Sequence, residues 1–210
     1  MPVESLITFA IASAILGIAP GPDNIFVLAQ SALYGKKSGF LVTLGLCTGL
    51  IVHTTAVAFG VAAIFQTSAV AFTLLKMAGA IYLLFLAWQA FRASADRFEG
   101  AGLNLRSSGA LYRRGIFMNI TNPKVSIFFL AFLPQFASPA HGQVAAQIFL
   151  LGGLFMVISL VIFSAVAVLA GQLGGWLNSS PKAQVYLNRI AGAVFASLAL
   201  KLATASANVK

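Results

Sequence analysis

The chain has 210 residues, of which 60% are hydrophobic and only 8% are Asp, Glu, Lys or Arg, and its mean hydropathy is +0.94. Because a soluble domain carries about 25% charged residues, this composition excludes a water-soluble fold and indicates a protein embedded in lipid. The net charge of +9 does not indicate nucleic-acid binding, since the basic residues stand between apolar blocks, where they set membrane orientation, and form no basic stripe.

Six apolar blocks follow one another along the chain, and each is long enough to cross a bilayer as a helix. A crossing of ~30 Å needs roughly 20 mainly apolar residues, and the longer blocks leave room for tilt or a break. We therefore predict an all-α fold, a polytopic transmembrane helical bundle with about six spans. In chain order the blocks cover residues 5 to 33, 39 to 65, 69 to 91, 114 to 135, 144 to 171 and 185 to 204.

The first block begins without the signature of a cleaved secretory signal. Its start carries the acidic Glu4 in place of a positively charged region, and the apolar run continues well past the small residues around Ala14. We expect this segment to remain as a membrane span.

The first span is broken near its middle, at Ala19-Pro20-Gly21-Pro22-Asp23-Asn24. Pro20 and Pro22 each remove a backbone donor, and Gly21 lets the chain unwind, so carbonyl groups near Ile18 and Ala19 should be free. In a bilayer such a break is tolerated only where it is buried in protein or lines a polar cavity. The half-helix that restarts there would direct its positive end into the cavity, where it can hold an anion such as a carboxylate. The alternative is a simple kink filled by neighbouring helices.

Asp23 is the only acidic residue inside an apolar block. An ionised carboxylate at the bilayer centre costs at least ~2.5 kcal/mol, so Asp23 needs a partner or a wet cavity. We expect Asp23 and the adjacent Asn24 to contribute to substrate binding or coupling. Capping of the restarting half-helix is the alternative role for Asp23, and the two roles are compatible.

The second block carries His53 beside Thr54 and Thr55, as well as Cys47, the only cysteine of the chain. An intramembrane histidine can relay protons, because it titrates close to neutral pH, but a neutral histidine bonded to a neighbouring helix fits the sequence equally well. A lone cysteine can form neither an internal disulfide nor a metal site. We interpret His53 as a residue of proton coupling or of packing, and Cys47 as a packing residue.

The fourth block is broken in the same way as the first, at Asn119-Ile120-Thr121-Asn122-Pro123-Lys124. Two such breaks in corresponding thirds of two halves point to the binding site of a transporter. If the halves are related by inversion, Lys124 lies at about the depth of Asp23, where it can pair with that carboxylate or bind the carboxylate of a substrate. Snorkelling of the lysine to the interface is the alternative.

The amides of the second break add hydrogen-bonding capacity. Asn119 and Asn122 stand on one turn and offer the donors and acceptors that recognition of a zwitterion requires in a low-dielectric site. Alternatively, they only satisfy the backbone groups that Pro123 frees.

The connections between the blocks set the expected orientation. The connections at 66–68 and 134–143 carry no Lys or Arg, whereas the segments after the first, third and fifth blocks are basic. By the positive-inside rule the basic connections are cytoplasmic, so both termini should face outward; Lys201 and Lys210 run against this scheme. The basic set comprises Lys36, Lys37, Arg92, Arg97, Arg106, Arg113, Arg114, Lys182 and Arg189.

These blocks form a single transporter domain over residues 1–210. Each half, about 1–93 and 112–210, holds three blocks and opens with a broken one, and residues 94–111 form a polar cytoplasmic linker. The pattern is that of a 3+3 inverted repeat, whose binding site is expected at the repeat interface near the midplane.

No cofactor motif accompanies this pattern. The sequence shows no Gly-rich phosphate loop, no clustered metal ligands and no nucleophile motif, so we expect no cofactor, no metal and no ATP-driven transport by this chain alone. An intramembrane enzyme using Asp23 and His53 is disfavoured, because no second acidic catalyst or metal set stands beside them.

The two breaks and their surroundings resemble those of a known family. The segment Ala19-Pro20-Gly21-Pro22-Asp23-Asn24 is followed by Gly35-Lys36-Lys37-Ser38-Gly39, and the second break continues into Phe128-Phe129-Leu130-Ala131-Phe132-Leu133-Pro134-Gln135-Phe136. Both stretches are similar to signatures of the lysine exporter and homoserine/threonine resistance family of bacterial amino-acid exporters. The resemblance implies a small, oligomeric inner-membrane exporter driven by the proton gradient. Substrate does not carry over, since members with basic, neutral and branched substrates share these motifs.

We therefore predict a secondary transporter, not an enzyme, that exports amino acids or close derivatives across the bacterial inner membrane by proton antiport. Its partners would be the substrate, protons, membrane lipid and further copies of the chain, but not nucleic acid. The alternatives are a passive channel that uses the same breaks and an exporter of another small metabolite or cation. The predicted site comprises Pro20, Gly21, Pro22, Asp23, Asn24, His53, Asn119, Asn122, Pro123 and Lys124.

Overall fold

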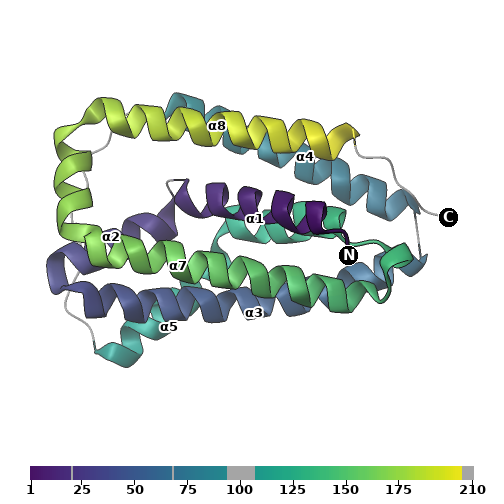
Figure 1. The fold of residues 1–210 in the computed structure, drawn as a ribbon, viewed down its shortest axis with the longest axis horizontal. Helices are drawn as coiled ribbons and strands as arrows, with labels where there is room; N and C mark the ends of the chain where they lie inside the picture. Colours follow the sequence, from purple (N-terminus) through teal and green to yellow (C-terminus); the bar gives the residue numbers. More distant parts are fainter. Residues whose placement is uncertain (20, 68, 94–106, 205–210) are drawn as a thin grey trace.

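The computed structural model describes residues 1–19, 21–67, 69–93 and 107–204, and these parts of the chain are helices with short connections and no strand (Figure 1). The prediction of an all-α fold is confirmed. Pro20 and most of the predicted linker, residues 94–106, lie outside the described residues.

The same order of elements occurs twice: a broken helix pair, a long helix and a helix of 24 residues. In the second half, the broken pair is extended by a π-helical turn and a 3-10 turn. The first half contains α1 (Val3–Ile18), α2 (Pro22–Tyr34), α3 (Lys36–Thr67) and α4 (Ala69–Arg92). The second contains α5 (Ser108–Thr121), α6 (Pro123–Ile127), η1 (Phe128–Phe132), η2 (Leu133–Phe136), η3 (Pro139–His141), α7 (Val144–Ser179) and α8 (Pro181–Thr204).

Both predicted breaks are present as sharp bends. The α1–α2 pair is bent by 56°, and the pair formed by α5 and Pro123–Phe136 is bent by 52°. Pro22 and Pro123 stand at the first positions of α2 and α6, where the missing N–H of proline costs no hydrogen bond. Proline therefore both ends one half-helix and starts the next.

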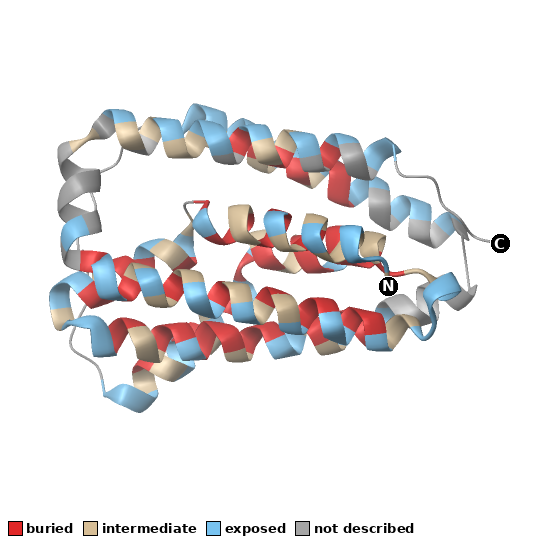
Figure 2. Ribbon diagram, viewed as in Figure 1, coloured by how far each residue is buried: buried red, intermediate tan, exposed pale blue. Residues whose placement is uncertain are grey.

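Two helices of the described chain are by themselves long and apolar enough to cross a membrane, over Lys36–Gly60 and Val144–Ala170, and each bent pair adds a broken span. The remaining two predicted spans fall on α4 and α8, which are not among the candidate spans of the described residues, so these two crossings stay predictions. At 1.5 Å per residue, a straight helix of 24 residues is about 36 Å long, enough for the ~30 Å hydrocarbon layer. Figure 2 shows buried positions facing the neighbouring helices and exposed positions on the outer faces.

The helices form a main body and a flanking pair. In Figure 1, α4 and α8 lie side by side above α1, whereas α2, α3, α5 and α7 are packed together below it. Close approaches use glycine, as expected where no hydrophobic effect drives association: Gly45 of α3 meets Gly115 of α5, and Gly192 of α8 meets Phe91 of α4.

The two ends of the molecule differ in charge. The start of α1 and the end of α8 lie at one end of the molecule (Figure 1), and the connections from α2 to α3 and from α7 to α8 lie at the other. That second end carries the exposed Lys36, Lys37 and Lys182, and we call it the basic end. At this end, α2 and α3 are joined by the single residue Gly35, whose φ of 85° favours glycine.

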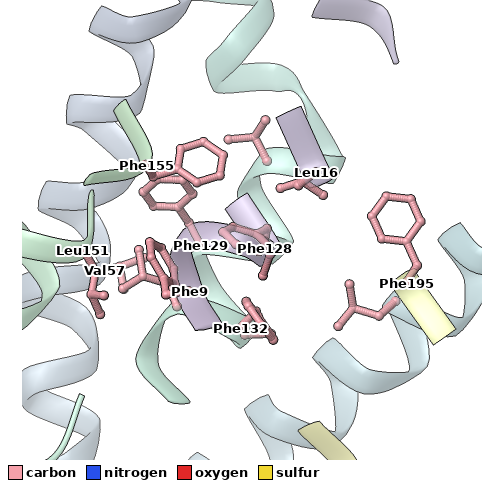
Figure 3. Close-up of a cluster of buried hydrophobic side chains, with 14 of the residues drawn as sticks. Phe9, Leu16, Val57, Phe128, Phe129, Phe132, Leu151, Phe155 and Phe195 are labelled. Carbon is pink, nitrogen blue, oxygen red and sulfur yellow. The ribbon is translucent and has the colours of Figure 1, made fainter. Parts of the chain in front are cut away.

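The interior contains two apolar clusters. The first, which we call the phenylalanine cluster, joins α1, η1 and α7 through the buried side chains of Phe9, Phe128, Phe129, Phe132 and Phe155, and Val57 of α3 packs in the same cluster (Figure 3). The ring centroids of the phenylalanines lie 4.9–6.2 Å apart, the range in which aromatic pairs attract. The second, the α2–α3–α7 core, consists of Phe26, Val27, Val42, Leu46, Leu111, Phe163 and Ala167.

Candidate functional site

The two breaks are in direct contact. Lys124 of the second break donates a hydrogen bond from Nζ to the carbonyl oxygen of Ala19 in the first, at 2.8 Å. Asn119, near the end of α5, donates from Nδ2 to Oδ2 of Asp23, at 3.4 Å. Residues 105 and 96 positions apart in the chain thus form one polar cluster between the two halves.

The first break presents its released carbonyl groups to side chains. Helix α1 ends at Ile18, and the sequence predicts free carbonyl groups near this point. The carbonyl of Ala19 accepts from Lys124, and that of Gly17 accepts from Nδ2 of Asn24 at 2.6 Å. Two predicted site residues therefore hold the broken backbone.

The second break satisfies its own backbone. Oδ1 of Asn122 accepts from the backbone N–H of Lys124 at 3.0 Å and so caps α6, an arrangement that stabilises a helix start. Ser126 donates from Oγ to the carbonyl oxygen of Asn122, also at 3.0 Å. Of the roles considered for Asn122, backbone satisfaction is present, and its side chain also lines the cavity described below.

Opposite charges share the site without touching. Asp23 is only 3% exposed, and its Oδ1 has no hydrogen-bond partner among the described residues; the same is true of Oδ1 of Asn119. The ammonium of half-buried Lys124 lies on the Ala19 carbonyl and 5.9 Å from the ring centroid of Phe195, within cation–π range. Since an ammonium has three donors, Lys124 retains capacity for another acceptor.

These groups enclose a small cavity. Its volume is about 20 Å³, and roughly 10–15 Å³ is enough for one water. The cavity therefore has room for about one water in this conformation, and a larger molecule would enter only if the helices moved apart. Its lining residues are Leu16, Gly17, Gly21, Asp23, Asn24, Leu50, Asn119, Asn122, Lys124, Val125, Phe155, Ser159 and Phe163.

The predicted site residues divide by position. Gly21 lines the cavity, and a Cβ on it would lie 3.3 Å from Nζ of Lys124. Pro22 and Pro123 are exposed and shape the breaks rather than line the cavity.

His53 stands beside the cavity rather than in it. Its Nε2 is 3.1 Å from the backbone oxygen of Asn119, and its ring centroid is 5.6 Å from that of Phe129. The hydrogen bond to a neighbouring helix is the packing role considered for this residue.

Sequence reasoning missed two features of the site. Ser159 of α7 is buried and lines the cavity, but nothing local in the sequence distinguishes it from Ser164 in the same apolar stretch. The second feature is Gly49 of α3, where a Cβ would come 2.7–2.8 Å from the side chain of Asn119. Gly49 thus makes room for the amide that holds Asp23.

A polytopic helical bundle with a charged, amide-lined cavity at two broken helices defines a membrane transporter of small molecules. A family model described as LysE type translocator matches residues 14–206. The chain belongs to this family, and it is a transporter rather than an enzyme.

Curated relatives cover nearly the full chain. A homoserine/homoserine lactone efflux protein of Salmonella typhimurium is 34% identical over 205 residues, which are 98% of each chain. A leucine efflux protein of Salmonella paratyphi A is 26% identical over 198 residues, 94% of this chain and 93% of the relative. An uncharacterized membrane protein of Vibrio cholerae is 30% identical over 207 residues, 99% and 100% of the two chains. No solved structure matches the chain.

Proposed function

We propose that this chain exports amino acids or close derivatives across the bacterial inner membrane by proton antiport, with the basic end in the cytoplasm and both termini outside. The observation that carries the proposal is the shared cavity of Asp23 and Lys124, one charge from each break. Names of the relatives support the substrate class, since they include efflux of homoserine, of homoserine lactone and of leucine.

The polar groups of the cavity complement the two ends of an amino acid. Oδ1 of Asp23 and Oδ1 of Asn119 are unpaired acceptors, which suit the three N–H donors of an ammonium group. The spare donors of Lys124 suit a carboxylate. A zwitterion would thus span from Asp23 to Lys124 and satisfy groups that are otherwise unpaired in a low-dielectric site.

The same carboxyl group supplies a route to proton coupling. A proton on Asp23 removes the charge that attracts the ammonium group, so proton and substrate compete for one site. Competition is the linkage that antiport requires, because each ligand lowers the affinity for the other by the same factor. The cavity of about 20 Å³ fits a transporter that opens to one side at a time better than a channel with a continuous pore.

The proposal also includes what covers the outer faces of the helices, namely membrane lipid or further copies of the chain. Large apolar side chains such as Phe59, Ile81 and Val161 are exposed, as expected where lipid or further copies of the chain cover the helices.

The test is efflux of a panel of labelled amino acids, homoserine lactone included, from cells that express the chain. We expect loss of one chemical class, and a protonophore should abolish that loss. Efflux that a protonophore leaves unchanged would contradict antiport, and conductance without coupling would establish a channel. Absence of efflux for the whole panel, at normal protein level, would contradict the amino-acid proposal.

A further inference from the structure

Buried oxygen atoms without a hydrogen-bond partner are concentrated in one part of the described chain. Two of them, on Asp23 and Asn119, face the cavity. The other three are Oε1 of Gln30, Oγ of Ser31 and Oγ1 of Thr43, and these side chains are 1%, 5% and 0% exposed. Native structures contain few such groups, and each needs a physical reason.

These three residues lie between the cavity and the basic end. Helices α2 and α3 are antiparallel neighbours joined by Gly35, and Oγ of Ser31 packs against the Cα of Gly39. Thr43 follows one turn along α3, and Asp23 lies two turns before Ser31 on α2. With four residues rising about 6 Å, Ser31, Thr43 and Asp23 form a ladder with one group per turn.

Gln30 belongs to the same face of α2 as Asp23. The two residues are seven positions apart, a spacing that returns a helical side chain to nearly the same direction. Gln30 lies beside Ser31, at the outer end of the ladder. Lys36 and Lys37 begin α3 just beyond it.

Helix α7 forms the third wall of this ladder. Ala167 of α7 lies against Gly39, at the level of Ser31. Phe163 and Ser159 precede Ala167 by one and two turns, and both line the cavity. The α2–α3–α7 interface thus runs without interruption from the cavity to the basic end.

The opposite side of the cavity has a different character. There the phenylalanine cluster fills the interior (Figure 3), and the buried polar side chains have partners. Ser13 donates to the carbonyl of Phe9, and Thr54 to that of Leu50. Gln147 bonds the backbone of Ser138 and Gly142. Among the residues that the structure describes, unpaired buried groups therefore mark only one direction out of the cavity.

We propose that Gln30, Ser31 and Thr43 line the closed passage between the basic end and the Asp23 cavity, and that they bind water and the polar substrate when α2 separates from α3 and α7. In the closed conformation these groups are dry and unpaired, whereas in the open conformation water satisfies them. Which compound moves through the passage rests on the proposed function, whereas the position of the passage in the fold does not.

Thiol labelling tests the passage in membranes. The only native cysteine, Cys47, is replaced by serine, and Thr43→Cys and Gln30→Cys are introduced singly. Membrane vesicles of both orientations are then treated with a membrane-impermeant cationic methanethiosulfonate. We expect both thiols to react at least about tenfold faster than buried apolar controls, because only a passage that opens locally exposes them.

Two kinds of control make the result decisive. Leu28 of α2 and Val57 of α3 are apolar residues that are 5% and 1% exposed, and Val57 belongs to the phenylalanine cluster on the other side of the cavity; Leu28→Cys and Val57→Cys are therefore the buried controls. Lys36→Cys marks the side of the basic end. The proposal is supported if Thr43→Cys and Gln30→Cys react from the same side that labels Lys36→Cys. It is overturned if they react no faster than the controls, or if they react from the opposite side only.

A second variant avoids the larger sulfur atom. Thr43→Val keeps the shape of the side chain and removes its hydroxyl. If Thr43 lines the passage, transport should fall several-fold while the melting temperature stays equal or rises, because an unpaired buried hydroxyl has been removed. Unchanged transport by Thr43→Val would contradict the proposed role. The labelling experiment needs no knowledge of the exported compound, so its failure and that of the amino-acid proposal are distinguishable.

Discussion

The first and second breaks use the same proline device but hold their backbones differently. The second break is self-contained, because Asn122 caps α6 and Ser126 bonds back to Asn122. The first break depends on Lys124 of the other half for its Ala19 carbonyl. The backbone of the second break is thus held locally, whereas the first break is tied to the second through Lys124 and, more weakly, through the bond from Asn119 to Asp23. A substrate carboxylate that draws Lys124 away would release the first break.

The largest effect is expected for Asp23→Asn. The amide keeps the size of the side chain but can neither attract an ammonium group nor exchange a proton, so efflux should be abolished while membrane insertion is normal. Efflux assays at matched protein level check this. Glu4→Gln, which removes the exposed acidic group of α1, is the control and should export like wild type. Export by Asp23→Asn at the wild-type rate would remove Asp23 from the site.

Lys124→Met should come next. It removes the cation and leaves the Ala19 carbonyl without its donor, so efflux should be lost and stability should fall by about 1–3 kcal/mol. Thermal unfolding in detergent measures the second effect. Lys37→Met, at an exposed basic position, controls for loss of positive charge. Normal efflux by Lys124→Met would show that the two breaks are not coupled through this lysine.

Gly49→Ala tests the position of Asn119 from α3, a helix outside the two breaks. Its methyl group would displace Asn119 and weaken the hold on Asp23, at a cost of about 1–3 kcal/mol for overpacking, and efflux should fall about tenfold or more. Gly153→Ala is the matched control, since a Cβ there meets nothing within 4 Å. Equal efflux by both variants would mean that Asn119 does not position the carboxyl group.

Asn122→Ala tests the self-contained break. Loss of an N-cap costs about 0.5–2 kcal/mol, so the main effect should be a lower melting temperature, with a smaller fall in efflux because Asn122 also lines the cavity. Asn24→Ala, which frees the Gly17 carbonyl, should instead alter transport more than stability. The reverse ranking in paired melting and efflux measurements would invert the roles assigned to the two breaks.

His53→Ala should have the smallest effect. It removes one hydrogen bond to the Asn119 backbone, worth about 1 kcal/mol, so efflux should fall a few-fold with the same pH profile. The rate measured from pH 5 to 8 checks this. A shifted profile would instead assign proton relay to His53.

The sequence predicts this fold well because its signals are local. Proline at positions 22 and 123 breaks a helix wherever it stands, and apolar blocks of span length indicate membrane helices in any arrangement. Asp23 and Lys124 could also be identified from the sequence as candidate site residues, since a charge inside an apolar block is costly. The partners were not visible: nothing local indicates that Lys124 meets the Ala19 carbonyl or that Ser159 reaches the cavity, because these contacts depend on how α1 and α7 pack. The inverted relation of the halves and the outward termini stay predictions.

The π-helical turn η1 has a consequence for the side of the cavity closed by the phenylalanine cluster. A π-turn holds an extra residue, so everything after it is offset by one position relative to a regular helix. Deleting one residue from Phe128–Phe132 would restore regular winding and rotate Phe136 by about 100°, away from the ring of Phe9 that it now meets at 5.2 Å. The contact between the rings of Phe136 and Phe9 therefore depends on the one extra residue in η1.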